Sequence, residues 1–141
     1  MSDHEAIRQL VARYARAIDT KDYAGIAACF TLDAVVDYGE AGPKLHGRAE
    51  LAENMRKALA PIDVTQHLFT NFIIALDGDA AELDCDVIAQ HVRRGEAGGE
   101  TLLVGARYQV RLARRPGGWL MAHVHEWIVW ADGNRAIVPG V

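Results

Sequence analysis

The spacing of the hydrophobic residues changes partway along the chain, and this change limits the classes of fold that the chain can adopt. From about His4 to Thr20, apolar residues recur every three or four positions, as on one face of an amphipathic helix. From Val64 onward, long segments are instead rich in the branched and aromatic residues typical of strands. We therefore expect helices first and a sheet second, which is an α+β arrangement.

The separators between the strand candidates have the length and chemistry of hairpin turns. Four long strands are expected, at Val64 to Leu76, Ala80 to Arg94, Thr101 to Arg114 and Trp119 to Trp130. Glycine, aspartate or proline is prominent in the separators 77–79, 95–99 and 115–118. Turns of this kind join neighbouring strands directly, so consecutive strands should pair antiparallel as a meander.

The first part of the chain is expected to contain three helices and one short strand. The first helix ends at a junction that contains Asp19, and a second, short helix continues through Phe30. A strand over 34–38, a loop over 39–47 and a third helix over 48–59 complete this part. Helices packed on a strongly curved antiparallel sheet would form a cone-like α+β barrel that encloses one apolar pocket.

The composition is that of one ordinary globular domain, which would span residues 1–141. A formal net charge of −4 provides no broad positive field for phosphate contacts, so nucleic acid is not an expected partner. No apolar run approaches the ~20 residues that a membrane helix needs, and the polar start of the chain is unlike a signal peptide. Cys29 and Cys85 lack paired spacing and should be reduced thiols. We therefore expect a cytoplasmic protein without a membrane partner.

Alternation along the strand candidates assigns several histidines to inner faces. His91 falls on the apolar face of the second long strand, opposite a face that carries acidic residues. On the first long strand, whose two faces are both apolar, His67 shares one face with Phe69, Asn71 and Ile73. One side of the last strand carries Trp119, Met121, His123, His125 and Trp127. This side is expected to form part of the pocket wall.

The inner histidines and nearby polar groups form a cluster suited to proton transfer. Asp19, Tyr14 and Tyr38 join these imidazoles, whereas a purely structural core avoids polar groups that each need a partner. Imidazole has an unperturbed pKa of about 6.5, and a carboxylate on its second nitrogen fixes its tautomer. An Asp–His dyad is therefore predicted, although any single one of these histidines could equally be a hydrogen-bonded core residue.

Metal binding, nucleophilic catalysis and cofactor binding are the alternatives to proton transfer by these residues. His123 and His125 lie two positions apart on a strand, so a metal site completed by His67 or His91 is an alternative. Ser2 is the only serine, which excludes acyl transfer through serine, and both cysteines lie in apolar contexts. The chain has no glycine-rich phosphate loop. We therefore predict a site that uses neither a metal nor an organic cofactor.

Short motifs carry a resemblance to a known family. Residues 19–23, Asp-Thr-Lys-Asp-Tyr, match an Asp-Ser-Lys-Asp-Trp stretch of that family, and residues 36–38, Val-Asp-Tyr, match an Ile-Asp-Tyr stretch. Residues 65–67, Thr-Gln-His, and His91 on the next strand match two histidine positions. Nearly the whole chain thus resembles the SnoaL-like branch of the nuclear transport factor two-like superfamily, and within it scytalone dehydratase. Ile18 departs from the tyrosine found there, so the resemblance extends to the proton-transfer groups and not to scytalone as the substrate.

The resemblance implies roles for individual residues. Asp19 and His67 would form the catalytic dyad, which hexachlorocyclohexane dehydrochlorinase also has, with Tyr38 and His91 as donors to the substrate. Tyr14 stands where a bile-acid dehydratase of the superfamily has an active-site tyrosine. Proteins of this kind usually associate through the convex face of the sheet, so a homo-dimer or homo-trimer is expected.

The predicted function is that of a cofactor-independent lyase or isomerase of the dehydratase type. His67 would remove a proton beside a carbonyl, and Asp19 would stabilise the imidazolium that forms. The substrate would be small and hydrophobic, polyketide-, terpenoid- or steroid-like, and would contact Phe30, Phe69, Val87, Tyr108, Met121, His125 and Trp127. A non-catalytic module that binds hydrophobic ligands and an assembly subunit of the same fold are the alternatives.

Overall fold

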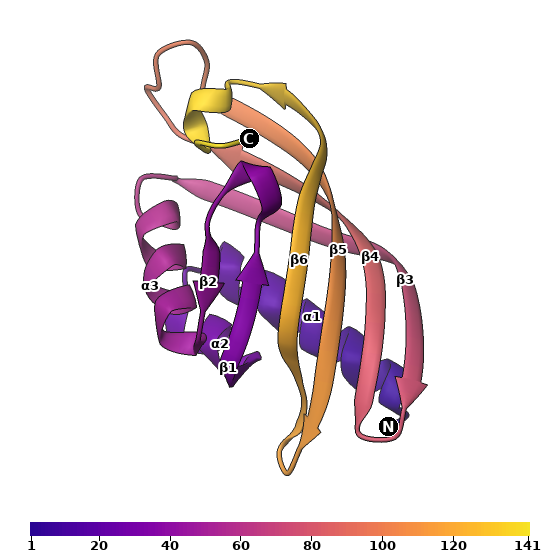
Figure 1. Ribbon diagram of the computed structural model, residues 1–141. Coiled ribbons are helices and arrows are strands. Elements are labelled where there is room, and N and C mark those ends of the chain that lie inside the picture. Colours follow the sequence, from indigo (N-terminus) through magenta and orange to yellow (C-terminus); the bar gives the residue numbers. More distant parts are fainter.

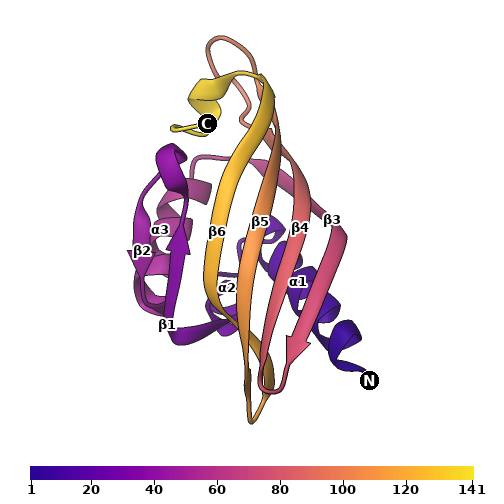
Figure 2. The same cartoon turned by 45° about the vertical axis from the view of Figure 1, so that its right-hand side comes forward.

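Three helices lie on one side of a strongly curved, six-stranded sheet (Figures 1 and 2). The structure is a computed structural model that describes residues 1–141, except for the side chain of Ala41. The helices are α1 (Asp3–Asp19), α2 (Tyr23–Ala28) and α3 (Arg48–Leu59). The strands are β1 (Phe30–Asp37), β2 (Lys44–His46), β3 (Val64–Asp77), β4 (Ala80–Val92), β5 (Thr101–Arg115) and β6 (Gly118–Gly133). The α+β cone predicted from the sequence is confirmed.

The sheet combines the predicted meander with one parallel pair. Its strand order is β2-β1-β6-β5-β4-β3, and β3 to β6 pair antiparallel in sequence order, as predicted. β1 instead runs parallel to β6, and β2 pairs antiparallel with β1. The sheet is mixed because β1 covers the edge of β6 that the meander leaves without a partner. The predicted second helix is shorter than expected, since Phe30 begins β1, and the predicted loop over 39–47 contains β2 and a 3-10 turn, η1 (Gly39–Ala41).

Helix α1 positions Asp19 beside the sheet. The side chain of Ser2 caps the start of the helix by accepting a hydrogen bond from the backbone N–H of Glu5, at 3.2 Å. The apolar face of α1 is buried, and the helix packs on β3. The helix ends at Asp19, and the backbone then turns through Lys21, at φ 54°, to Asp22, whose side chain caps α2. Asp19 is thereby held against β3.

A β-bulge in β3 reverses the faces predicted for its second half. The pairing with β4 shifts between Thr70 and Ile73, and Asn71 adopts a φ of 56°. His67 and Phe69 therefore point inward as predicted. Beyond the bulge, Phe72 is the next side chain that points inward. The prediction that Asn71 and Ile73 share the face of His67 is wrong, and Ile73 is 70% exposed. One extra residue in a strand exchanges the two faces for every residue that follows.

Strand β6 also contains a β-bulge, and this bulge changes which residues reach the site. Met121 pairs with Leu112 but His123 pairs with Arg111, so Ala122 is an extra residue in β6. Trp119 and Met121 are buried as predicted, and beyond the bulge the buried position is Val124. His123, His125 and Trp127 therefore lie on the outer face of the sheet, not on the pocket wall. The inner face receives Val124, Glu126 and Ile128 instead.

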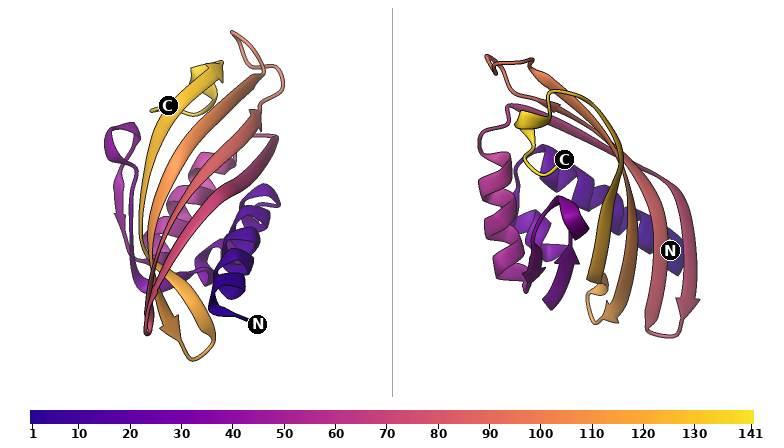
Figure 3. Two further views of the ribbon diagram at one scale, coloured as in Figure 1. Left: turned by 90° about the vertical axis from the view of Figure 1, so that its right-hand side faces the viewer. Right: turned by 45° about the horizontal axis from the view of Figure 1, so that its top comes forward.

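The end of the chain folds back over the inner face. The turn η2 (Arg135–Ile137) lies at the same end of the molecule as the β4–β5 loop and far from the N-terminus (Figure 3). Ile137 is 2% exposed and packs in a small cluster with Ile62, Leu102 and Val104. Burial of an isoleucine stabilises such a contact by roughly 1.5–3 kcal/mol. Among the helices that the structure describes, none is both long and apolar enough to cross a membrane.

Candidate active site

A cavity of about 490 Å³ lies between the inner face of the sheet, α1, α3 and the end of the chain. Its size is ordinary for a small-molecule site. Every long strand contributes at least one side chain to it. The hydroxyl, imidazole and carboxyl groups that line the cavity belong to Tyr14 of α1, Tyr38 after β1, His67 of β3, His91 of β4, Tyr108 of β5 and Glu126 of β6. Asn54 and Lys57 of α3 and Arg93 after β4 line it as well.

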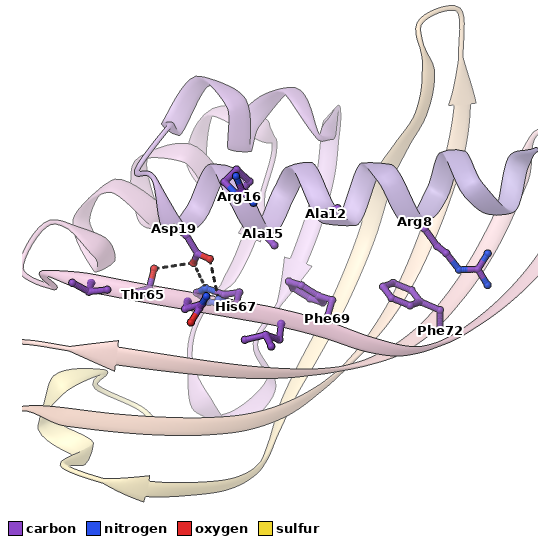
Figure 4. A pocket seen from close by; sticks show the side chains of 12 residues that line it. Arg8, Ala12, Ala15, Arg16, Asp19, Thr65, His67, Phe69 and Phe72 are labelled. Atoms are coloured by element: carbon purple, nitrogen blue, oxygen red, sulfur yellow. Dashed lines mark hydrogen bonds and ion pairs between the residues drawn. The ribbon is translucent and has the colours of Figure 1, made fainter. Parts of the chain in front are cut away.

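The predicted dyad is present and tightly hydrogen-bonded (Figure 4). His67 Nδ1 lies 2.7 Å from Asp19 Oδ1, and the backbone N–H of His67 donates to Asp19 Oδ2 at 3.0 Å. The Thr65 hydroxyl donates to Asp19 Oδ1, also at 3.0 Å. Because an ionised carboxylate only accepts, Nδ1 of His67 carries a proton, and in the neutral ring Nε2 is the nitrogen without one. Thr65, which was not among the predicted site residues, helps to fix this carboxylate.

The same contacts keep Asp19 ionised. Burial acts to raise the pKa of Asp19. Other contacts outweigh burial and lower the pKa below its usual value: the hydrogen bonds from the side chain and backbone of His67, the charge of His67, and the hydrogen bond from the Thr65 hydroxyl. The Asp19 side chain is 19% exposed and the His67 side chain 12%. An ionised carboxylate in this position stabilises an imidazolium, which is the state that His67 reaches when it removes a proton.

His91 is held differently from His67. Its Nδ1 lies 3.1 Å from the backbone carbonyl oxygen of Leu102, which can only accept, so Nδ1 carries the proton. Burial lowers the pKa of His91, with a backbone hydrogen bond opposing, and the residue is 8% exposed. The neutral ring therefore offers Nε2 to the cavity as an acceptor, which differs from the donor role expected from the sequence. The His67 and His91 rings meet edge to face, with centroids 5.8 Å apart.

The cavity also contains three tyrosines, Tyr14, Tyr38 and Tyr108. Burial raises the pKa of each of them, so all three hydroxyls stay protonated and can donate hydrogen bonds. The ring of Phe69 supports two of them, with centroids 6.0 Å from Tyr14 and 5.1 Å from Tyr108. The Tyr38 hydroxyl has only a weak protein partner, Met55 Sδ at 3.7 Å. It is therefore available to a substrate oxygen.

Glu126 is the functional candidate that sequence reasoning missed. Strict alternation from Trp119 places Glu126 outside, and only the bulge at Ala122 turns it into the cavity. Burial raises the pKa of Glu126, while the Tyr108 hydroxyl and His67 oppose the rise. The sequence did contain one signal, because the same alternation would have exposed the apolar residues Val124 and Ile128 together with Glu126.

Several residues predicted to line the pocket do not reach it. Phe30, Val87 and Met121 are buried in the core beneath the cavity, and Phe69 supports the tyrosines from the α1–β3 side. Tyr108 does line the cavity. The rings of His125 and Trp127 are in contact on the outer face, with centroids 5.2 Å apart and planes tilted by 38°, and His125 Nδ1 lies 3.8 Å from Asp37 Oδ2. The bulge in β6 is the reason, since it reverses the face that both residues occupy.

The alternative metal site does not form from these residues. His123 and His125 lie on the outer face of the sheet, whereas His67 and His91 line the inner cavity. Across the part of the chain that the structure describes, no three histidine, cysteine or carboxylate side chains gather as a metal ion would require. The four histidines therefore cannot complete one ligand set.

A second, open groove of about 750 Å³ lies between α1 and β3 (Figure 4). Arg8, Arg16 and Phe72 border it, and Asp19 and His67 lie in its floor. The groove contains none of the tyrosines and not Glu126. The smaller inner cavity is the better candidate for an active site, because His67, the neutral donors and the apolar walls meet there, with Asp19 behind His67 on the groove side.

The fold and the site define a class of protein: a cone-shaped α+β domain whose inner cavity is lined by the histidine of a carboxylate–histidine pair. Residues 1–125 match the family model of the SnoaL-like domain. The chain belongs to the SnoaL-like family, and its fold is the nuclear transport factor 2-like fold. The resemblance that the sequence motifs indicated is thus confirmed.

Two relatives are similar over nearly their whole length. Terrestric acid biosynthesis cluster protein E of Penicillium crustosum is 29% identical over 97% of this chain and 90% of its own length. The crystal structure of a candidate aromatic ring hydroxylase of Novosphingobium aromaticivorans has a TM-score of 0.86 and 28% identity, and the match covers 96% of this chain and 95% of that one.

Two further structures resemble the chain in fold alone. A candidate scytalone dehydratase of Novosphingobium aromaticivorans has a TM-score of 0.85 and 18% identity, with 93% of this chain and 87% of its own covered. The hexachlorocyclohexane dehydrochlorinase LinA has a TM-score of 0.82 and 20% identity, with 93% and 88% covered. The chain therefore shares its fold with a protein named as a dehydratase and with a dehydrochlorinase.

Proposed function

We propose that this protein is a cofactor-independent lyase or isomerase in which His67 removes a proton beside a carbonyl group of a small hydrophobic substrate. The observation that carries the proposal is the 2.7 Å contact between Asp19 Oδ1 and His67 Nδ1, on a histidine that also lines the inner cavity. This contact fixes the tautomer in which Nε2 of the neutral His67 ring is the nitrogen that can act as a base.

The neutral donors complete the proposed mechanism. When the proton leaves, negative charge develops on the carbonyl oxygen, and the hydroxyls of Tyr14, Tyr38 and Tyr108 can donate hydrogen bonds to it. Each donor aimed at such an oxygen lowers the barrier by roughly 3–4 kcal/mol, and a positioned base contributes roughly 10²–10⁴-fold. His91 would accept a hydrogen bond from a substrate hydroxyl or from water, because its proton is on the nitrogen that faces Leu102.

The cavity supports a flat, largely apolar substrate. Ile18, Ile62, Ile128 and Ile137 surround the polar cluster, and the volume of about 490 Å³ suits a ligand of two to three fused rings. One relative is named for a terrestric acid biosynthesis cluster, which fits a role in the synthesis of a small organic molecule. A polyketide-, terpenoid- or steroid-like compound is the proposed substrate class.

Deuterium exchange of 1-tetralone, a bicyclic aromatic ketone, tests the proposal without knowledge of the natural substrate. The wild-type protein in D₂O should accelerate exchange at the carbon beside the carbonyl, as followed by proton NMR. H67N should lose roughly 10²–10⁴-fold of that acceleration. E82Q is the matched control, because Glu82 is exposed on the outer face of β4. Equal exchange by H67N and the wild type would rule out His67 as the base.

The alternative function is binding without catalysis, which a largely apolar cavity would equally serve. A binding module would hold 1-tetralone with unchanged affinity in the wild type and in D19N, and neither protein would exchange its protons above the rate in buffer. The same NMR samples therefore separate the two functions.

A further inference from the structure

Glu126 lines the same cavity as the neutral donors Tyr14, Tyr38 and Tyr108. It is the only acidic side chain among the described residues that line the cavity. Tyr108 is its direct cross-strand neighbour. The two basic residues at the cavity mouth are engaged elsewhere, Arg93 with Glu96 at 2.9 Å and Lys57 with Glu53 at 3.7 Å. Neither of these two cations pairs with Glu126, and a carboxyl group withdrawn from water without a paired cation is more stable protonated than ionised.

The base and this carboxyl group approach the cavity from different walls. β4 and β5 separate β3, which carries His67, from β6, which carries Glu126. In a flat sheet that separation would be roughly 14 Å, but curvature turns the two inner faces toward one another. The contact between Phe69 of β3 and Tyr108 of β5, with centroids 5.1 Å apart, spans part of this distance. A bicyclic substrate in the cavity would therefore have a base on one side and a carboxyl group on another.

We propose that Glu126 is the general acid of an elimination: it protonates the departing hydroxyl group of a β-hydroxy ketone while His67 removes the proton beside the carbonyl. This inference rests on the proposed function and adds the class of substrate and reaction. Hydroxide is a poor leaving group, so an elimination of water needs a proton at that oxygen, and His67 alone supplies none.

The step balances without any other reactant. The C–H bond beside the carbonyl breaks, and its proton passes to Nε2 of His67. The electron pair of that bond forms the new carbon–carbon double bond, the C–O bond breaks, and the hydroxyl group leaves as water with the proton from Glu126. Glu126 ends as a carboxylate and His67 as an imidazolium, and a proton moves from His67 to Glu126 through water to restore both. Burial raises the pKa of Glu126, which favours the protonated starting state.

Two probes that differ only in the leaving group test the assignment. 3-Hydroxy-1-tetralone must lose water, whereas 3-acetoxy-1-tetralone loses acetate, which leaves without a proton. Both give 1-naphthol, which is measured by its absorbance. E126Q should slow the loss of water by roughly 10²–10⁴-fold and slow the loss of acetate at least tenfold less. H67N should slow both losses alike, and E82Q neither.

The outcomes are distinguishable. A ratio of hydroxy to acetoxy rates in E126Q equal to that of the wild type would overturn the assignment of Glu126, even if His67 remains the base. A wild-type protein inactive on both probes would count against the proposed function and against β-hydroxy ketones as substrates.

A second measurement needs no turnover. The carboxyl ¹³C signal of Glu126, identified by its loss in E126Q, should report a protonated group at neutral pH. The titratable or charged groups that share the cavity and could alter this titration are Tyr14, Tyr38, Lys57, His67, His91, Arg93 and Tyr108. A carboxyl group already ionised at neutral pH would overturn the proposal, whatever the probes show.

Discussion

Replacement of Asp19 by asparagine should separate the catalytic from the structural role of this residue. In D19N, the carbonyl oxygen of the asparagine can still accept the backbone N–H of His67, as Asp19 Oδ2 does at 3.0 Å. The amide group of the asparagine takes the place of Oδ1, which lies 2.7 Å from His67 Nδ1. Two donors cannot face each other, so Nδ1 must become the acceptor and the proton must move to Nε2. His67 would then present a donor to the cavity and could not act as a base.

The two effects should differ in size. D19N loses one charge-assisted hydrogen bond but keeps the backbone contact, and the Thr65 hydroxyl can rotate to accept, so the free energy of unfolding should fall by only about 1–2 kcal/mol. The loss of the base should lower the exchange of 1-tetralone by roughly 10²–10⁴-fold, which corresponds to about 2.7–5.5 kcal/mol. The effect on the rate should thus exceed the effect on stability.

Urea unfolding and deuterium exchange on the same samples measure the two effects. T65V is the matched variant, since it removes only the hydroxyl that donates to Asp19 and leaves the His67 contact in place. It should lose about 1 kcal/mol of stability and retain most of the exchange activity. If D19N exchanged 1-tetralone at the wild-type rate, or if T65V lost as much activity as D19N, the tautomer argument would be refuted.

The stability difference between wild type and D19N should also depend on pH in one direction. The pKa of Asp19 is lower in the folded protein than in the unfolded chain. Its stabilisation is therefore complete above the unfolded value of about 3.9 and is lost as the pH falls through the folded value. Unfolding curves between neutral and acidic pH should show the advantage of the wild type shrinking on the acid side, and growth on that side would contradict the assignment.

Three more predictions concern other parts of the fold. Because burial raises the pKa of Glu126, the wild type should lose stability relative to E126Q as the pH rises from about 4.3 through the folded pKa, and urea unfolding that shows no such pH dependence would contradict the burial of this carboxyl. A Cβ at Gly105 would lie 2.3 Å from the indole of Trp130, so G105A should lower the free energy of unfolding by about 1–3 kcal/mol, and an unchanged urea midpoint would show that the ring moves freely. Gly105 pairs with Ile88 on one side and with Trp130 on the other, and these two side chains are 42% and 43% exposed on the outer face of the sheet. This apolar row fits a contact between copies of the chain, so sedimentation should detect a homo-dimer or homo-trimer that I88E weakens. A monomeric wild type would exclude such a contact.

The local patterns in the sequence were sufficient to predict most of the architecture. Two of these patterns, the helical periodicity of the first segment and the hairpin turns between the long strands, depend only on residues that are neighbours in the sequence. The structure accordingly has α1, α3 and the meander of β3 to β6 close to the predicted bounds. The motif around Asp19 and the histidine at position 67 also identified the dyad, which the fold brings to 2.7 Å although 48 positions separate the two residues. Such a pair is predictable because each partner has its own recognisable sequence context.

The pairing of distant segments was not predictable from the same patterns. β1 lies beside β6 in parallel, and the closing residues around Ile137 fold over the cavity, because each finds an exposed edge or apolar surface that only the assembled sheet offers. No local signal in either segment specifies its partner. Long-range contacts of this kind follow from the burial available in the finished fold.

The sequence by itself determined which residues could transfer protons, since imidazole, carboxylate and phenol groups carry that chemistry wherever they lie. Tertiary structure decided which of them meet. A single extra residue, Ala122, turns Glu126 into the cavity and sends His125 and Trp127 to the outer face. Alternation has a period of two, so one bulge reverses the faces of the residues that follow until a second register shift, which in β6 comes at Val129. A bulge is set by the twist and packing of neighbouring strands rather than by the strand's own sequence.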